Sequence, residues 1–297
     1  MMFIVPLILG IAAGSSVELA PLHFATETLE IIAMGDVGEP ESGLEMTAKM
    51  INEKFGSTAS TAFLLGDNFY PAGVEDVEDP MFEEIFVNLI AKSLPEVKFH
   101  VILGNHDYKG DPEAQIEYSK LNAKWVMPSK YYRRDFVSDS AVTCVWFLDT
   151  QLLRGEDPEQ LSWLDSTLAA SSHCNWKIVT GHHGIYSAGK YADDVALVRD
   201  LLPVLEQHGV DLYLSGHDHQ SRVFRREGSV KTFIFITAGA SADVFYCKKR
   251  HNHQVWCDAD FNAFVHLSIK RAELTYSFIE SETGKTLFTE TIQSSLP

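Results

Sequence analysis

The sequence predicts an α+β fold of the α/β/β/α sandwich type, in which two packed mixed β-sheets are flanked by helices. Three features of the chain predict it. Apolar strand-like runs alternate with helix-period segments in the first half, and the last third reads as short strands joined by turns. Short polar blocks, each opening on glycine, follow several of the strand-like runs. Parallel units followed by a meander are typical of two sheet layers with helices outside.

The expected strands are short runs rich in apolar residues. Those that precede the polar blocks are residues 29–34, 61–65, 99–103, 177–180 and 212–215. The expected meander consists of residues 222–225, 232–237, 263–269, 273–279 and 286–291. A strand buried on both faces delivers its last residue to one rim of the sheet, where open sheets place their binding sites. We therefore expect the polar blocks to converge.

The helices are predicted from their start and stop signals. Ser42 with Glu45 forms a capping box, and Gly56 is expected to end that first helix. An Asp-Pro pair precedes each of the next helix-period segments, at Asp79-Pro80, Asp111-Pro112 and Asp157-Pro158. Aspartate suits the N-cap and proline suits the first helical position. Residues 194–207 form a further predicted helix, in which Pro203 is expected to produce a kink.

Length and composition indicate one domain with a sizeable core. The chain has 297 residues, of which 45% are hydrophobic. The polar blocks run from Asp36 to His219 and have to converge, so we expect a single domain over residues 28–297. The formal net charge of −17 argues against nucleic acid or an anionic membrane as partner. Phosphate substrates stay open, because bound cations would reverse the field locally.

Residues 1–14 are expected to be a signal peptide. The first thirteen residues are apolar and contain no acid, and small residues follow as a cleavage site. A buried first strand is the alternative. The run is shorter than the roughly 20 apolar residues that a membrane span needs, so no membrane anchor is expected. The predicted location is secreted or lysosomal/vacuolar.

The four cysteines are expected to form two disulfides in such an oxidising compartment. Four cysteines allow three pairings, and the sequence leaves these open. Cys247 and Cys257 flank one polar insertion and are the favoured pair, which leaves Cys144 with Cys174. The insertion at residues 248–253 is expected either to attract phosphate to the rim or to be a solvated loop.

The polar blocks carry residue types that hold metal ions. The candidate ligands are Asp36, Asp67, Tyr70, Asn105, His182, His217 and His219. Each is ordinary when taken alone, as a turn residue, a surface histidine or a core tyrosine. Their joint occurrence after strands favours a pair of ions about 3.5–4 Å apart, with Asp67 as the bridge. We expect His217 and His219 to face this pair because residues i and i+2 of an extended segment point to one side.

These blocks, in this order and spacing, resemble the metallophosphoesterase superfamily, and the block Gly66-Asp67-Asn68-Phe69-Tyr70 resembles the purple acid phosphatases. The similarity is to the small, single-domain, tartrate-resistant (type 5) kind, and it implies the calcineurin-like metallophosphoesterase fold. It implies that Asp36, Tyr70 and His219 hold Fe(III). A divalent ion (Fe, Zn or Mn) would lie on Asn105, His182 and His217, with Asp67 bridging. Carboxylate, phenolate and imidazole donors suit these metals.

The resemblance implies an acid phosphatase that hydrolyses phosphate monoesters by attack of a metal-bound hydroxide. The expected substrates are small-molecule or phosphoprotein phosphomonoesters. The resemblance implies His106 as a substrate-binding residue and catalytic general acid. Asn105 and Tyr191 are the other expected substrate-binding residues. The alternative for His106 is a hydrogen bond with Asp107. Tyr191 stands where relatives usually carry a histidine, and a phenol is a poor acid at low pH.

A catalytically weakened scaffold protein on the same fold is the alternative function. The replacement at Tyr191 favours it, whereas the complete set of metal-ligand residues opposes it. His183 is expected to have a structural role, because the family often has another residue there. Residues 151–160 are too short to form the inhibitory loop of mammalian relatives. The sequence leaves the oligomeric state open.

Overall fold

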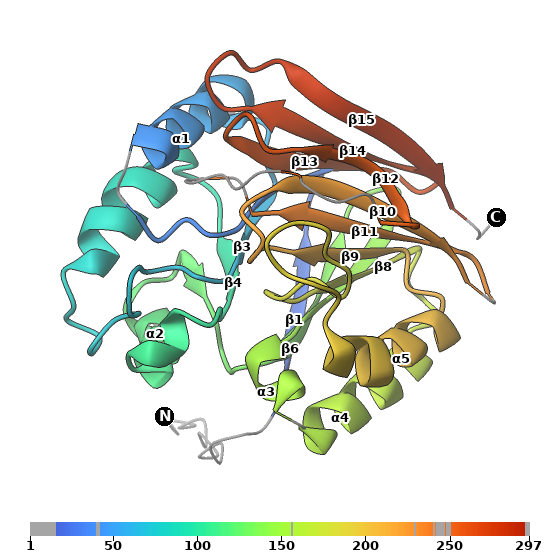
Figure 1. Ribbon diagram of the computed structural model, residues 1–297. Helices are drawn as coiled ribbons and strands as arrows, with labels where there is room; N and C mark the ends of the chain where they lie inside the picture. The colour runs from blue at the N-terminus through green and yellow to red at the C-terminus, as the bar shows by residue number, and fades with distance from the viewer. Residues whose placement is uncertain are drawn as a thin grey trace, which may run out of the picture.

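Two β-sheets pack face to face and helices cover both outer faces, as the computed structural model shows (Figure 1). The structure describes residues 16–39, 42–155, 157–228, 230–239, 241, 247 and 251–294. The predicted α/β/β/α sandwich is confirmed. The expected signal peptide at residues 1–14 and the basic residues 248–250 lie outside the described residues.

The seven-stranded sheet has the strand order β15-β14-β13-β2-β3-β4-β5. Its strands are β2 (Leu29–Met34), β3 (Thr61–Leu65), β4 (Phe99–Ile102), β5 (Trp125–Val126), β13 (Ala263–Ile269), β14 (Glu273–Glu280) and β15 (Thr286–Gln293). Strands β2 to β5 are parallel, and β13 to β15 join β2 as an antiparallel meander. The sequence predicted all of these strands except β5.

The eight-stranded sheet has the order β1-β6-β7-β8-β9-β11-β10-β12. Its strands are β1 (Val17–His23), β6 (Tyr132–Val137), β7 (Val142–Phe147), β8 (Trp176–Thr180), β9 (Leu212–Ser215), β10 (Ser221–Glu227), β11 (Thr232–Ala238) and β12 (Gln254–Asp258). Strands β7, β8, β9 and β11 run parallel to one another. The sequence did not predict β1, β6, β7 and β12.

The side chains of the inner strands divide between three hydrophobic layers. In β2, Ile31 and Ala33 face the layer between the two sheets, whereas Ile32 and Met34 face the helices outside. The layer between the sheets also contains Phe63 of β3 and its opposite neighbours in the other sheet. Burial on both faces explains why these strands read as continuous apolar runs.

The helices lie in two groups. The first group, beside the seven-stranded sheet, contains α1 (Ser42–Phe55), the π-helix η1 (Phe82–Ala91), the short 3-10 helix η2 (Asp107–Lys109) and α2 (Pro112–Leu121). The second group, beside the eight-stranded sheet, contains α3 (Thr150–Arg154), α4 (Pro158–Ala169), the π-helix η3 (Leu197–Leu201) and α5 (Leu202–Gln207). Figure 1 shows α1 and α2 on one side and α3, α4 and α5 on the other.

The expected helix signals operate at α2 and α4. The carboxylate of Asp111 accepts a hydrogen bond from the backbone N–H of Glu113, and that of Asp157 accepts one from Gln160. Pro203 lies in the first turn of α5, directly after the π-helical turn η3. The wider π-helical turn therefore accommodates Pro203. The structure has two joined helical segments where one kinked helix was expected.

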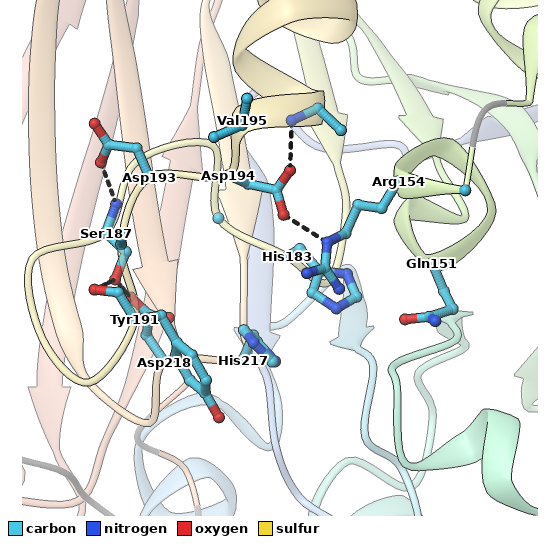
Figure 2. Close-up of a pocket in the computed structure, with 14 residues that line it drawn as sticks. Gln151, Arg154, His183, Ser187, Tyr191, Asp193, Asp194, Val195, His217 and Asp218 are labelled. Atoms are coloured by element: carbon cyan, nitrogen blue, oxygen red, sulfur yellow. Dashed lines mark hydrogen bonds and ion pairs between the residues drawn. The ribbon is translucent and has the colours of Figure 1, made fainter.

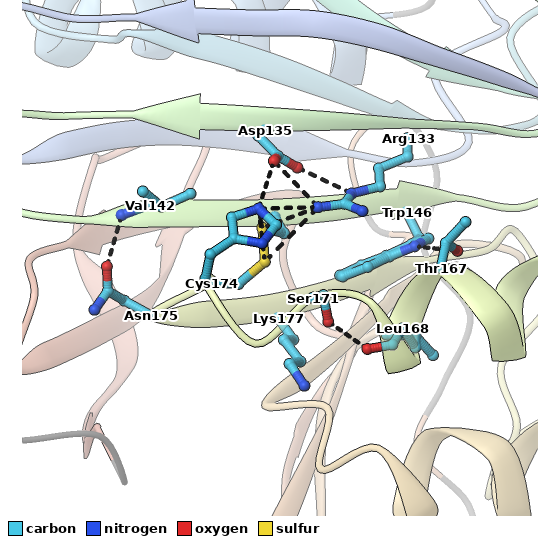
Figure 3. The surroundings of a disulfide bond; sticks show 12 residues. Arg133, Asp135, Val142, Trp146, Thr167, Leu168, Ser171, Cys174, Asn175 and Lys177 are labelled. Carbon is cyan, nitrogen blue, oxygen red and sulfur yellow. Dashed lines mark hydrogen bonds and ion pairs between the residues drawn. A yellow bond between two sulfur atoms is a disulfide. The ribbon is translucent and has the colours of Figure 1, made fainter.

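Both disulfides join the cysteines that the sequence favoured. Cys144 pairs with Cys174, and Cys247 pairs with Cys257. Figure 3 shows the first of them at β7, where Arg133 and Asp135 of β6 form an ion pair at 3.0 Å. The guanidinium of Arg133 lies 4.9 Å from the ring of Trp146. The charged residues of β6 are thus accommodated at a partly covered face, which explains why this strand was missed.

The N-cap of α4 provides a test of the sequence signals that predict where helices begin. We expect Asp157→Ala to lower the free energy of unfolding by about 1 kcal/mol, because the backbone N–H of Gln160 loses its acceptor. Urea denaturation followed by circular dichroism measures this. Glu159→Ala, an exposed position in the same helical turn, is the control and should change stability by less than about 0.5 kcal/mol. Equal effects of the two substitutions would contradict the capping role.

Candidate metal centre

The ends of five parallel strands meet at one rim of the sandwich. Strands β2, β3 and β4 of the seven-stranded sheet are followed by the predicted oxygen donors, which are Asp36, Asp67, Tyr70 and Asn105. Strands β8 and β9 of the eight-stranded sheet are followed by the predicted nitrogen donors, which are His182, His217 and His219. The cluster therefore spans the seam between the two sheets.

One group of donors gathers around the hydroxyl of Tyr70. This oxygen lies 3.1 Å from Oδ1 of Asp36 and 3.0 Å from Nε2 of His219. Nε2 of His219 lies 3.4 Å from Oδ1 of Asp36. This group has the membership that the family resemblance implied for Fe(III).

A second group gathers around Nε2 of His182. This nitrogen lies 3.2 Å from Oδ1 of Asn105 and 3.3 Å from Nδ1 of His217. The carboxylate of Asp67 stands between the two groups. Its Oδ2 lies 3.0 Å from the Tyr70 hydroxyl and 3.4 Å from Nε2 of His182. All seven predicted ligand residues are therefore brought together, with Asp67 in the bridging place.

Four of these residues adopt a backbone conformation that is unfavourable for side-chain-bearing residues. Asp36, Asp67, His217 and His219 have φ angles of 58°, 52°, 68° and 47°, and they are the non-glycine residues of the described chain with positive φ. Each such conformation costs on the order of 1–3 kcal/mol and persists where the surroundings enforce it. Strain concentrated on predicted ligands favours a functional role for the cluster.

The same angles correct one expectation. His217 and His219 do face the cluster, but they are not on an extended segment, because both have left-handed backbone conformations. His217 is orientated by its backbone N–H, which donates to Oδ2 of Asp36 at 2.8 Å. The i, i+2 spacing therefore gave the right residues for the wrong geometric reason.

Backbone groups hold the donors in place. Nδ1 of His182 lies 2.8 Å from the carbonyl oxygen of Leu65 and donates to it, so that Nε2 faces the cluster. The N–H of His106 donates to Oδ1 of Asp67 at 2.8 Å. Gly104 permits the close approach of Asp67, because a Cβ at Gly104 would lie 2.2 Å from Oδ1 of Asp67. The carboxylate of Asp67 is therefore fixed on both sides.

The buried cluster contains too few positive charges to balance its carboxyl and phenol groups. Burial raises the pKa of Asp36 well above its ordinary value and also raises the pKa of Tyr70, whose hydroxyl meets two carboxylates. Burial also tends to raise the pKa of Asp67, but the charge and hydrogen bond of His182 together with those of His106 outweigh burial and lower the pKa of this carboxyl. Burial lowers the pKa of His182, but the charge and hydrogen bond of Asp67, the charge of Asp36 and the hydrogen bond to Leu65 together outweigh burial and raise this pKa to about 9. The protein alone therefore keeps protons here.

The donor set fits a pair of metal ions. Carboxylate and phenolate oxygens suit a hard ion, and imidazoles with an amide oxygen suit a borderline ion. External cations would replace the protons of Tyr70 and His182 and remove the charge deficit, which is how metal binding couples to ligand pKa values. Asp36, Asp67 and His182 are also close enough together to share an ion.

The alternative role of His106, a hydrogen bond with Asp107, is not found among the described residues. Nδ1 of His106 lies 2.7 Å from the carbonyl oxygen of Pro71, and within the described chain the side chain of His106 makes no hydrogen bond with Asp107. Asp107 instead accepts from the backbone N–H groups of Asn68 and Gly104 and from the Gln115 amide. Asp107 therefore fixes the two neighbouring loops, a role that the sequence did not reveal.

A hollow of about 260 Å³ opens over the cluster. Among the residues that line it are Asp67, Asn105, His106, Lys190 and Tyr191. The ring of Tyr191 stacks on His217 with 4.4 Å between ring centroids and is 37% exposed. The proposed substrate-binding residues Asn105, His106 and Tyr191 thus line one hollow. Within the described chain, no helix has the length and apolar character needed to cross a bilayer.

His183 lies behind the cluster and is almost fully buried. Its Nδ1 and its backbone N–H both contact Oγ1 of Thr150, at 2.8 and 3.0 Å, and its carbonyl oxygen accepts from the hydroxyl of Tyr213. Burial, together with nearby positive groups, lowers the pKa of His183 well below its ordinary value, so the ring is neutral. These contacts are those of a residue that anchors its neighbour His182.

Comparison with known proteins identifies the class. The model of the calcineurin-like phosphoesterase family matches residues 29–221. The chain is 33% identical to human tartrate-resistant acid phosphatase type 5, over 89% of this chain and 90% of that protein. It is 31% identical to purple acid phosphatase 17 of Arabidopsis thaliana, over 72% of this chain and 69% of that protein.

Solved structures show the same fold. GAP50, the anchor in the inner membrane complex of Plasmodium, superposes with a TM-score of 0.81 at 22% identity, over 90% of this chain and 89% of that one. Purple acid phosphatase PPD1 from yellow lupin gives 0.71 at 17% identity, over 90% of this chain and 54% of that one. The chain belongs to the calcineurin-like phosphoesterase family, and its relatives within it are the purple acid phosphatases.

The glycine beneath Asp67 tests the geometry of the centre. We expect Gly104→Ala to lower metal affinity by at least about 10-fold, because the added methyl group would displace the Asp67 carboxylate. Metal analysis after dialysis against graded chelator measures the change. Gly155→Ala is the control, since the nearest atom to its Cβ is 3.3 Å away. Unchanged metal binding by a folded Gly104→Ala protein would contradict the arrangement.

Proposed function

We propose that the protein is an acid phosphatase that hydrolyses phosphate monoesters at a dinuclear centre of Fe(III) and a divalent metal ion (Fe, Zn or Mn). Asp36, Tyr70 and His219 would hold the ferric ion. Asn105, His182 and His217 would hold the divalent ion, and Asp67 would bridge the two. The observation that carries the proposal is the convergence of these donors into two groups joined by Asp67.

When bound, the two ions would activate a water molecule and neutralise charge on the phosphoryl group. The side chains of this protein position the substrate in the hollow. Nδ1–H of His106 donates to the carbonyl oxygen of Pro71, and Nε2 of His106 lies 3.4 Å from the ammonium of Lys109. In the proposed reaction Nε2 would face the substrate and donate a proton to the leaving oxygen. Lys190 and Tyr191 close the other side of the hollow. The phosphate esters of small molecules or of phosphoproteins are the proposed substrates.

We also propose that the protein works in an oxidising compartment, as a secreted or lysosomal/vacuolar enzyme with a signal peptide at residues 1–14 and a catalytic domain at residues 28–297. The two disulfides support this location, because such bonds persist mainly outside the cytosol. The relatives named as acid phosphatases support the reaction.

A catalytically weakened scaffold protein is the second candidate. The aromatic residue at Tyr191, where the family usually has a histidine, favours it. The complete donor set and the strained backbone beneath it oppose it, because a scaffold has no need to maintain either. Metal binding without phosphatase activity would favour the scaffold.

The proposed function is tested on the purified mature chain after loading with iron. We expect visible absorption from the tyrosinate–iron(III) contact and hydrolysis of 4-nitrophenyl phosphate at acid pH. Asp67→Ala should lower kcat at least about 100-fold, because both ions lose their shared ligand. Tyr70→Phe should abolish the visible absorption, whereas Tyr118→Phe, a buried tyrosine in the helix layer, should not. A colourless, inactive wild-type protein would overturn the proposal.

Replacing Tyr191 tests whether a second proton-donating residue at this position would increase the rate. We expect Tyr191→His to raise kcat for ethyl phosphate at least about 10-fold at acid pH, because an imidazolium can protonate a poor leaving group. The rate with 4-nitrophenyl phosphate, which needs no acid, should change less than about threefold. Tyr191→Phe is the control and should show no gain. Equal rate changes for both substrates would exclude a proton-donating role at this position.

A further inference from the structure

A second cavity, of about 610 Å³, adjoins the metal centre and has no part in the function proposed so far. His217 and Tyr191 line both this cavity and the hollow over the metal ligands, so the two spaces meet at their stacked rings. Figure 2 shows the lining of the cavity, with the guanidinium of Arg154 directed towards His183. A substrate whose phosphoryl group lies on the metal ligands therefore has this cavity beside it.

Arg154, the last residue of α3, presents a positive charge that a molecule in the cavity can reach. Its side chain is 40% exposed, and its Nε donates to Oδ2 of Asp194. Within the described part of the chain, the two Nη groups of this guanidinium have no hydrogen-bond partner. The far end of the guanidinium thus offers a pair of accessible N–H donors, in the geometry that binds a carboxylate or a phosphate through two parallel hydrogen bonds.

Asp194 fixes the direction of this guanidinium. Oδ1 of Asp194 accepts the backbone N–H groups of Ala196 and Leu197, at 3.1 and 3.0 Å. The carboxylate is therefore held by the backbone on one side and takes Nε of Arg154 on the other. This contact orientates Arg154 but occupies only one edge of its guanidinium, so the Nη groups stay directed at the cavity (Figure 2).

The other two carboxyl groups of the lining are engaged away from Arg154. Asp218 is 3% exposed and accepts from the hydroxyl of Ser187. Asp193 accepts from the backbone N–H of Ser187 and contacts His251 at 3.1 Å, and Figure 2 shows its carboxylate directed to the Ser187 side of its loop. Among the described residues that line the cavity, Arg154 is the side chain with a permanent positive charge. The charged group that the lining leaves accessible and incompletely bonded is therefore a cation.

The charge of Arg154 also reaches the metal centre. Burial and the charge of His182 lower the pKa values of His183 and His217, and the positive charge of Arg154 contributes to both shifts. His217 lines the cavity and the hollow alike. A ligand that spans the two spaces therefore has the metal ligands at one end and Arg154 at the other.

We infer that Arg154 binds a second anionic group on the alcohol part of the substrate, so that the protein prefers phosphate monoesters whose leaving group carries a carboxylate or a further phosphate. The inference rests on the proposed function, because it takes the phosphoryl group to lie on the metal centre. Arg154 is a specificity-determining residue, and Asp194 is its positioning residue. The exposed ring of Tyr191 lies against the carbon chain that joins the two anionic groups.

The test compares substrates of the iron-loaded protein that are matched in length. They are ω-carboxyalkyl phosphates of increasing chain length, the corresponding primary amides, and the alkane bisphosphates of the same lengths. At the best length we expect kcat/KM to be at least about fivefold higher for an anionic ester than for the amide, because the amide lacks the charge that pairs with the guanidinium. The larger gain identifies the anion that the site favours. Equal values for the amide and for both anionic esters at every length would overturn the inference.

Variants assign the preference to the guanidinium. Arg154→Gln should lower kcat/KM for the favoured anionic ester by about 5- to 20-fold and leave the value for the amide within about twofold. Arg154→Lys should keep part of the preference, because it retains the charge but not the two parallel donors. Arg199→Gln is the matched control and should leave the preference unchanged. Arg199 is likewise exposed and paired with an aspartate, Asp200, but lies outside the cavity lining.

A binding measurement separates recognition from chemistry. The phosphonates that correspond to the best carboxylate and to its amide are not hydrolysed, because carbon replaces the leaving oxygen. Calorimetry with the iron-loaded protein should give a Kd at least about fivefold lower for the carboxylate phosphonate, and this difference should disappear in Arg154→Gln. Equal Kd values for the two phosphonates with the unaltered protein would contradict recognition by Arg154.

The outcomes separate this inference from the function on which it rests. If the iron-loaded protein hydrolyses 4-nitrophenyl phosphate but Arg154→Gln lowers kcat/KM equally for the anionic ester and the amide, the inference alone fails. If the iron-loaded protein hydrolyses no phosphomonoester, the proposed function fails and the substrate preference fails with it. A selective loss with the anionic ester in Arg154→Gln supports both.

Discussion

The central constraint of this molecule is the shortage of positive charge among the buried donors at the rim. Asp36 and Asp67 are in contact with one phenol and with imidazoles, and burial alone opposes the ionised form of both carboxyls. Without added cations the cluster keeps protons on Tyr70 and His182, since the pKa values of both are raised. Buried ionisable groups without enough partners of opposite charge would ordinarily move apart or become exposed to water. Here the fold prevents that, and two cations would resolve it.

The fold prevents separation because the donors belong to two different sheets. The seven-stranded sheet supplies the oxygen donors and the eight-stranded sheet supplies the imidazoles. The distance between the two kinds of donor is therefore set by the hydrophobic layer between the sheets, where Ile31 and Phe63 meet residues such as Phe147 and Ile178. Packing in this layer, remote from any chemistry, decides whether Asp67 reaches His182. Asp36 and Asp67 have positive φ angles where the chain leaves these strands, and the N–H of Asp36 donates to the carbonyl oxygen of Gly66 at 3.1 Å.

Much of this could be predicted from the sequence, for a physical reason that also explains the failures. Strands buried on both faces carry long apolar signals, so β2, β3 and β9 were predicted with the bounds that the structure has. The edge strand β1 carries no such signal, because its partner β6 lies far along the chain. Strand β6 was missed because of its charged residues, although it pairs with the next strand along the chain, β7. The ligand residues followed from the ends of buried strands. The role of Asp107 depends on two loops meeting, and no local pattern reveals that.

The second cavity gives a physical meaning to the residue that departs from the family pattern. Tyr191 stacks on His217 and stands between the two spaces, and its loop is held by contacts of Ser187 with Asp193 and with the carbonyl oxygen of Tyr191. A histidine at this position would add a second titrating group, but its smaller ring would separate the two spaces less completely. The tyrosine instead provides a broad apolar face that stacks on His217 beside polar groups. In the proposed function, the departure would weaken proton donation at this position.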